Sequence, residues 1–365
     1  MARRMRSNRS ADLGSLFGNS PADRAMERVP PVAASPEVRA LAARMPAHVH
    51  LGTSSWAYPG WRGIVFGDRA PAAALASEGL AAYASWPLAR TVGLDRAFYA
   101  TPSADEYRAL AALVPPAFRF TVKADQRVTR PDMDTDGSTL GSTVALRAAG
   151  VANPCFLDAG FLAHEVIAPA QAGLGALLGP VVLQFPSLDL ASRGRLGGAE
   201  AFIDRLGGFL SDARSMLGAG VVLAVEVRNR ECFRAANAQR YAAALRAGTA
   251  AHAFLQHPTV PSIGEQRRAL AEAGCDASSF PAVVVRWMLP AGTTYQAAAD
   301  RFEPFDRLQA PDPAVRSEVV AILASSAAAR PGFVVINNKA EGSAVRSVEA
   351  LAHEIAGGGP PGHAG

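Results

Sequence analysis

A carboxylate and a guanidinium lie two residues apart near the middle of the chain, at Glu226 and Arg228, at the end of the apolar run Val221–Arg228. Alternate side chains of a β-strand point to the same face, so this spacing predicts that the two groups lie side by side. Two interpretations stay open. The pair is a structural ion pair at one end of the fold, or Glu226 is a general acid/base whose charge Arg228 tunes.

Lysine is almost absent from the chain. Of the 36 basic side chains only two, Lys123 and Lys339, are lysine, and the Ala-, Arg- and Gly-rich composition is typical of a GC-rich genome that replaces lysine by arginine. A position that keeps lysine offers a compact ammonium, or an amine that can lose its proton when buried. Both lysines end apolar runs, Phe118–Lys123 and Phe333–Lys339, that predict buried strands. We expect them to hold a ligand; a nucleophilic amine and chance survival with the amine in solvent are the alternatives.

The elements that carry these residues form a repeating pattern from His48 onward. The strand-like runs are His48–Ser54, Thr91–Tyr99, Arg119–Lys123, Val181–Phe185, Val221–Arg228, Thr249–Leu255, Ala282–Trp287 and Phe333–Asn338. The helical patterns are Pro71–Ser85, Ala104–Leu113, Phe161–Leu178, Ala199–Leu217, Arg234–Arg246, Ser262–Ala273, Asp312–Ala329 and Ser343–Ile355. Repeats of this kind, with several strands apolar on both faces, predict an α/β fold, a closed (β/α)8 barrel of the TIM type. Ser103 with Glu106 predicts a capping box at one helix start.

The carboxyl ends of the strands of such a barrel converge on one end, here called the mouth, where chemistry is placed. The predicted catalytic residues there are Glu226, Lys123 and Lys339. The predicted substrate-binding residues are Thr53, Ser54, Trp56, Tyr99, Gln184, Arg228, Asn229, Arg286, Asn337 and Asn338. The cations of this set predict an electropositive mouth that binds a phosphate, carboxylate or sulfate. The aromatic residues Trp56, Trp61, Tyr99, Phe185 and Trp287 either stack on a sugar ring or a base, or only pack the barrel end.

Several other classes of site lack their motif. No GxGxxG, GxxxxGK[ST] or G-x-S-x-G segment occurs, so nucleotide fingerprints and a serine triad are not expected. We predict no cofactor; a divalent metal on Glu226, Asp95 and His257 is the alternative. The three cysteines are widely spaced and form no zinc pattern or even disulfide set, which indicates a reducing cytoplasm.

Charge divides the chain into parts. Residues 1–45 hold eight arginines and four acidic residues, whereas the remainder holds 28 basic and 28 acidic side chains. We predict a flexible Arg-rich leader at 1–45, a barrel at 46–356 and a flexible tail at 357–365. The Gly-rich stretch Asp125–Ala159 is expected to be a lid or a disordered excursion. The neutral barrel argues against nucleic acid as a partner, and no apolar run reaches the roughly 18 residues of a membrane span.

The motifs together resemble those of the YecE-like family, also called domain of unknown function 72. Its opening "GTSGWSYPxW" is matched by Leu51–Trp56 with Tyr58, Pro59 and Trp61, and further similarity covers Phe98-Tyr99, Pro116–Lys123, Leu178–Pro186, Ala224–Asn229 and Asn337–Ala344. The resemblance spans roughly residues 48–355. It implies a TIM barrel, in agreement with the strand count, and no settled activity.

Two departures from the family pattern affect the mouth. Where the family usually has "VEINxTFY", this chain has Gly93 in place of the glutamate and Asp95 in place of the asparagine. The common "HG" after the seventh strand is Trp287-Met288 here. Losing a carboxylate from the second strand weakens any mechanism that needs two acids at the mouth. This chain is therefore expected to be a divergent member of the family.

The favoured hypothesis is a cytoplasmic barrel enzyme, a hydrolase, lyase or isomerase, acting on a small anionic or sugar-like ligand. Glu226 would be the acid/base, and Lys123, Arg228, Arg286 and Lys339 would hold the anion. The alternative is a non-catalytic barrel that binds a metabolite or nucleic acid. The sequence predicts no oligomeric state.

Overall fold

The core of the molecule is a closed barrel of parallel strands. The computed structural model describes residues 29–68, 70–133, 151–191 and 194–357. The barrel strands are β1 (Val49–Thr53), β2 (Thr91–Leu94), β3 (Arg119–Lys123), β6 (Leu178–Gln184), β7 (Leu223–Glu226), β8 (Ala251–Gln256), β9 (Val283–Trp287) and β10 (Gly332–Ile336). They pair in the order β1-β10-β9-β8-β7-β6-β3-β2, and β2 pairs with β1 to close the barrel. This confirms the predicted (β/α)8 architecture.

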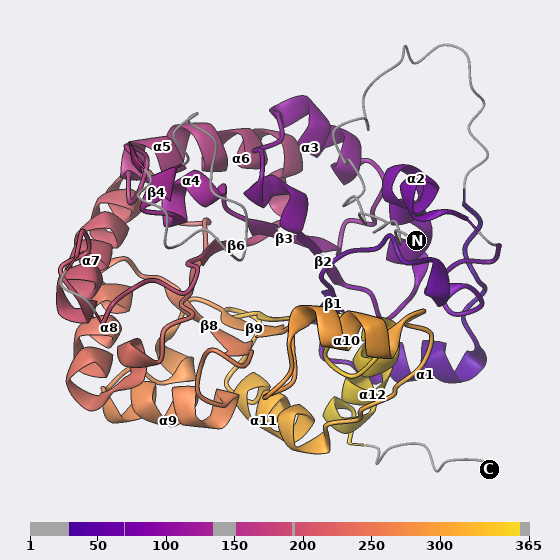
Figure 1. Ribbon diagram of the computed structural model, residues 1–365. Coiled ribbons are helices and arrows are strands. Elements are labelled where there is room, and N and C mark those ends of the chain that lie inside the picture. The colour runs from indigo at the N-terminus through magenta and orange to yellow at the C-terminus, as the bar shows by residue number, and fades with distance from the viewer. Residues whose placement is uncertain (1–28, 69, 134–150, 192–193, 358–365) are drawn as a thin grey trace, which may run out of the picture.

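Helices surround the strands (Figure 1). They are α1 (Pro36–Arg44), α2 (Ala72–Ser85), α3 (Ala104–Ala111), α4 (Gln126–Thr129), α5 (Ala159–Phe161), α6 (Ala168–Leu174), α7 (Ala199–Met216), α8 (Ala235–Ala247), α9 (Ile263–Glu272), α10 (Tyr295–Phe302), α11 (Pro313–Leu323) and α12 (Ala344–Ile355). The predicted capping box is present at α3, where the Ser103 hydroxyl accepts from the Glu106 amide and the Glu106 carboxylate accepts from the Ser103 amide. Each repeat thus places one helix start or loop at the barrel mouth.

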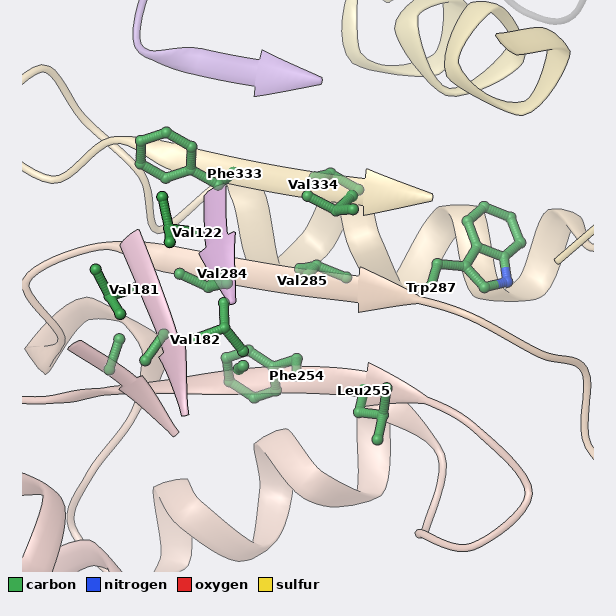
Figure 2. Packing of buried hydrophobic residues seen from close by; sticks show 14 of the residues in the cluster. Val122, Val181, Val182, Phe254, Leu255, Val284, Val285, Trp287, Phe333 and Val334 are labelled. Carbon is green, nitrogen blue, oxygen red and sulfur yellow. The ribbon is translucent and has the colours of Figure 1, made fainter. Parts of the chain in front are cut away.

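Apolar side chains fill both sides of the strands. All residues of β1, β7, β8, β9 and β10 are buried, which is the pattern of a parallel sheet covered on its outer face by helices. Figure 2 shows Val122, Val182, Phe254, Val284 and Phe333, which come from five of the barrel strands, packed close together. The barrel is therefore a packed core rather than a pore.

Three expected boundaries are corrected by the structure. The run Thr91–Tyr99 is a strand only as far as Leu94, and a short 3₁₀ helix, η3 (Asp95–Phe98), follows it. The polar pair Asp95-Arg96 ends the ladder, and Tyr99 therefore lies beyond the strand. The run Val221–Arg228 is a strand only over β7, so Arg228 lies in the following loop. The helix expected to reach residue 329 ends at Leu323.

The N-terminal expectation also changes. The leader was predicted to be flexible through residue 45. In the structure, α1 occupies part of this range, and its Leu41 is 1% exposed in the hydrophobic core. Residues 1–28 lie outside the described part of the chain, as do 358–365 of the predicted tail. Within the predicted excursion, α4 and a small antiparallel sheet, β4 (Asp132–Met133) with β5 (Val151–Ala152), are described, and residues 134–150 are not.

Candidate active site

The centre of the barrel mouth is a buried carboxylate held by two arginines. Glu226 is the last residue of β7 and has 0% exposure. The Arg228 Nε donates to its Oε1 at 3.0 Å, and the Arg286 Nη1 donates to its Oε2. The contact between Glu226 and Arg228 expected from their spacing is therefore confirmed, and Arg286 of β9 completes a three-residue ion pair. Both oxygens of the carboxylate are occupied.

Arg286 connects this pair to two further elements. Its Nη1 donates to Gln184 Oε1 of β6 at 2.9 Å, and its Nη2 lies 3.4 Å from Asp95 Oδ1 of η3. Burial disfavours the Arg286 charge, but Glu226 and Asp95 outweigh it and raise the pKa of the guanidinium. We call these five residues, Glu226, Arg228, Arg286, Gln184 and Asp95, the arginine cluster.

The charge state of Glu226 follows from its neighbours. Burial alone raises the pKa of a carboxyl, but Arg286, Arg228 and Lys123 outweigh it and hold the pKa of Glu226 at about 2. The group is therefore a carboxylate at all physiological pH values. Its complete burial and its occupied oxygens suit the orientation of two guanidinium groups.

Lys123, at the end of β3, faces the same cluster without joining an ion pair. Its side chain is buried, and the Nζ lies 3.7 Å from the ring centroid of Phe98 in η3. No hydrogen bond or ion pair joins this amine to another residue of the described ranges. Burial lowers the pKa of Lys123 to about 8, helped by Arg286 and Arg228 and opposed in part by Asp95 and Glu226.

Lys339 follows β10 and is enclosed by aromatic rings. It is 5% exposed, and its Nζ lies 4.0 Å from the ring centroid of Tyr295 and 5.3 Å from that of Phe305. Its backbone is held because the Lys339 amide donates to Asn337 Oδ1 at 3.0 Å, and Asn337 Nδ2 donates to Ser54 Oγ at 3.0 Å. The predicted residues Ser54, Asn337 and Lys339 are thus joined in one arrangement beside β1.

Other predicted binding residues have structural partners. Thr53 Oγ1 bonds the Tyr83 hydroxyl of α2, and Trp56 Nε1 donates to the Leu75 carbonyl. Asn229 bonds both backbone groups of Leu188, and Asn338 Oδ1 accepts from Trp61 Nε1 and the Ala344 amide. These four side chains hold loops and helices in place. Of the five aromatic walls predicted, only Tyr99 is exposed; Trp56, Trp61, Phe185 and Trp287 are buried and pack the barrel end.

The predicted binding residue Tyr99 lies near two residues that the sequence did not assign to substrate binding, Tyr295 and Asp95. Tyr295 is 63% exposed beside Lys339, and Tyr99 is 65% exposed beside Phe98. Burial raises the pKa of Tyr99, and both Asp95 and Tyr295 add to that shift, so the three lie near one another. The Asp95 side chain is 40% exposed. In the sequence, Asp95 was marked by its departure from the family asparagine and by its place in the alternative metal set, whereas Tyr295 had no signal.

The histidines do not form a ligand set. His252 faces α8 and α9, where its Nδ1 lies 3.0 Å from the Tyr241 hydroxyl and its Nε2 lies 3.1 Å from Gln266 Oε1. Burial and Arg228 lower the pKa of His257 to about 4. Within the described ranges no group of three or more His, Cys, Asp and Glu side chains is placed to hold a metal ion. The set of Glu226, Asp95 and His257 therefore has no such geometry.

The molecule is a closed (β/α)8 barrel whose mouth carries four cations and two carboxylates at or just after the strand ends. These features define a TIM-barrel protein with a candidate site at its mouth. The chain belongs to the family described as "Protein of unknown function DUF72", whose model matches residues 50–361. This confirms the predicted membership. No curated protein matches the chain. Among the residues described, no helix is long and apolar enough to cross a membrane.

A solved structure of the same family shares the architecture. A DUF72 family protein from Enterococcus faecalis V583 matches with a TM-score of 0.52 and 15% identity, over 85% of this chain and 95% of that one. A DUF72 family protein from Thermotoga maritima MSB8 matches with a TM-score of 0.48 and 16% identity, over 84% of this chain and 97% of that one. At these identities the first likeness supports the fold alone.

Proposed function

We propose that the chain is an enzyme that acts on a small anionic or sugar-like molecule bound at the barrel mouth. One observation carries this proposal: the cations Lys123, Arg228, Arg286 and Lys339 outnumber the carboxylates Glu226 and Asp95, and within the described ranges neither lysine contacts a carboxylate. Burying an unpaired charge is costly. A bound anion would supply the missing negative charge.

Each residue of the mouth has a role in this proposal. Arg228 is 23% exposed at its side chain, so its guanidinium can reach a ligand while it keeps one bond to Glu226. Lys339 follows β10, which is three strands away from β7 in the barrel and pairs with β1. Glu226 orients the two arginines rather than exchanging protons, since it is fully buried and both its oxygens are bonded. Proton exchange falls to Lys123, because burial lowers the pKa of its amine to about 8, close to neutral pH.

The exposed tyrosines support a ring-shaped ligand. Tyr99 and Tyr295 are both largely exposed, and the Lys339 Nζ lies 4.0 Å from the ring centroid of Tyr295. Aromatic faces stack on sugar rings and other planar groups, and cations behind them hold an attached phosphate or carboxylate. A sugar phosphate or a ring carboxylate would satisfy both features.

The binding part of the proposal is tested by titrating inorganic phosphate, sulfate and citrate into the protein by isothermal calorimetry. We expect at least one of them to bind, and Arg228→Gln to weaken its binding about tenfold through loss of a charge-assisted bond. Arg240→Gln is the matched control, because Arg240 pairs with Asp204 on the outer surface of α7 and α8. Absence of binding by the unmodified chain, or an equal loss in both variants, would refute an anion site at the mouth.

Turnover separates this proposal from its alternative, a non-catalytic barrel that binds a metabolite. Incubation with a panel of sugar phosphates and small carboxylic acids, followed by proton NMR, should show conversion of at least one compound by the unmodified chain and none by Lys123→Met. Binding without conversion would favour the non-catalytic alternative. Binding of nucleic acid would instead appear as strong salt dependence. We also propose a cytoplasmic location, which the three unpaired thiols of Cys155, Cys232 and Cys275 support.

A further inference from the structure

Lys123 has an environment that differs from that of an ordinary strand-end lysine. Its amine lies on the face of the Phe98 ring, is almost completely removed from solvent, and has two guanidinium groups of the arginine cluster as neighbours. The carboxylate that would neutralise it, Glu226, is already shared between Arg228 and Arg286. Desolvation and a neighbouring cation are the two conditions that make a lysine amine nucleophilic.

We propose that Lys123 forms an imine with the aldehyde or ketone carbonyl of an anionic substrate whose anion is held by Arg228, which Glu226 keeps in place. This inference rests on the proposed function and narrows it. An imine draws electrons from the neighbouring carbon, so it serves the breaking of a carbon–carbon or carbon–hydrogen bond next to the carbonyl. It therefore favours a lyase or an isomerase over a hydrolase.

The amine is available for this step near neutral pH. With a pKa of about 8, about half of the Lys123 side chains are uncharged at pH 8, whereas an ordinary lysine with a pKa of 10.5 is uncharged in well under about 1% of molecules. The Nζ of Lys339 instead lies 4.0 Å from the ring centroid of Tyr295 and 5.3 Å from that of Phe305. The two lysines of the chain are thus distinguishable by their surroundings.

The bonds and protons of the step balance without a further reactant. The Lys123 Nζ lone pair attacks the carbonyl carbon, a C–N bond forms, and the carbonyl oxygen takes a proton to give a carbinolamine. The C–O bond then breaks, and the oxygen leaves as water with the two protons that the amine carried. Asp95 is the carboxylate placed to relay these protons, because its side chain is 40% exposed and its charge acts on Lys123. Glu226 is not available, since both its oxygens are bonded.

The chain itself makes the experiment selective. It holds only two lysines besides its α-amine, so an amine-directed probe has few sites. The probes are pyridoxal 5′-phosphate, an aldehyde that carries a phosphate, and pyridoxal, the same aldehyde without it. Each is added to the full chain, trapped with borohydride and located by peptide mass spectrometry. The variants are Lys123→Met, Lys339→Met and Arg228→Gln, with circular dichroism to check folding.

We expect one trapped adduct, on Lys123, to form at least tenfold faster with pyridoxal 5′-phosphate than with pyridoxal. It should survive in Lys339→Met, disappear in Lys123→Met, and lose its dependence on the phosphate in Arg228→Gln. The rate should rise with pH and level off above about pH 8, as the amine loses its proton.

Two results would overturn the inference. Labelling of Lys339 or the α-amine without Lys123 would show that Lys123 is a binding charge and not a nucleophile. Equal rates of adduct formation with pyridoxal 5′-phosphate and pyridoxal in the unmodified chain would show that no anion-binding group lies beside the Lys123 amine. The phosphate titration of the unmodified chain separates the two proposals: binding of phosphate with no adduct on Lys123 removes the imine and leaves the anion site intact.

Discussion

Replacement of Glu226 by glutamine should destabilise the protein strongly, although the two side chains have nearly the same shape. The change removes the charge that Arg228 and Arg286 share, and among the described residues it leaves Asp95 as the one carboxylate that pairs with Arg286, which is 3% exposed. Removing one partner of a buried ion pair costs about 3–5 kcal/mol, because the other charge stays buried without compensation.

The pKa of Glu226 gives an independent estimate of the same quantity. Its lowering from 4.5 to about 2 corresponds to about 3 kcal/mol of stability, at about 1.4 kcal/mol for each tenfold change in proton affinity. Because the folded pKa is depressed, this contribution is fully present above pH 4.5 and is lost as the pH falls toward 2. The two estimates agree to within their precision.

Equilibrium unfolding in urea at pH 7 measures the effect. We expect Glu226→Gln to lower the free energy of unfolding by about 3 kcal/mol, and the difference from the unmodified chain to shrink between pH 4.5 and pH 3. Asp204→Asn is the control, since its pair with Arg240 is solvent-exposed and should be worth less than about 1 kcal/mol. A loss below about 1 kcal/mol for Glu226→Gln, or a difference that does not change with pH, would refute the assigned role of this carboxylate.

Three further predictions concern the lysines and one histidine. Lys123→Met should raise the free energy of unfolding at pH 7 by about 1–3 kcal/mol, because a buried amine whose pKa is lowered destabilises the folded state. In urea unfolding this gain should disappear between pH 8 and pH 10.5. Absence of a gain at pH 7 would contradict a buried, unpaired Lys123 amine. Lys339→Met should weaken phosphate binding about tenfold by calorimetry with little change in stability, and unchanged affinity would remove this lysine from the site. His252→Leu should lower the free energy of unfolding in urea by about 2–4 kcal/mol, because Tyr241 and Gln266 lose a buried hydrogen-bond partner. A loss of phosphate affinity of more than twofold in this variant would contradict a purely structural role for His252.

The strands were predictable because a parallel barrel buries them on both faces. Runs such as Ala282–Trp287 are apolar throughout, so their positions follow from composition alone. The contact of Glu226 with Arg228 was predictable from a two-residue spacing, even though Arg228 lies just past the strand. The strand at Thr91–Tyr99 was overextended because its aromatic end resembled a strand, whereas the polar Asp95-Arg96 step turns the chain into η3.

The contacts between strands were not predictable in the same way. Arg286 of β9 contacts Glu226 of β7 across the intervening strand β8, because all three strands belong to one closed barrel. Their separation of 60 residues in the sequence does not predict this contact. The enclosure of Lys339 by Tyr295 and Phe305 depends on the path of the chain between β9 and α11, which apolar periodicity does not describe. The strand ends that form the site were therefore predictable from the sequence, whereas the ion pairs and ring contacts between them were seen only in the structure.

The departures from the family pattern at Gly93 in β2 and at Asp95 in η3 are linked through the charge balance at Lys123. An added Cβ at Gly93 would lie 3.3 Å from Ser54 Cα and 3.4 Å from Val335 Cγ1, so this position is crowded and carries no carboxylate here. The acid stands instead at Asp95, past the end of β2, where it is partly exposed and pairs with Arg286. A carboxylate kept within the barrel at residue 93 would favour a protonated Lys123, by the same attraction through which Asp95 raises its pKa. A carboxylate at residue 95 instead of 93 leaves the number of negative charges in this segment unchanged. It also leaves the Lys123 amine buried beside the two arginines and places a partly exposed carboxylate, Asp95, close enough to act on that amine. The departures therefore fit a nucleophilic Lys123 better than an ion-paired one.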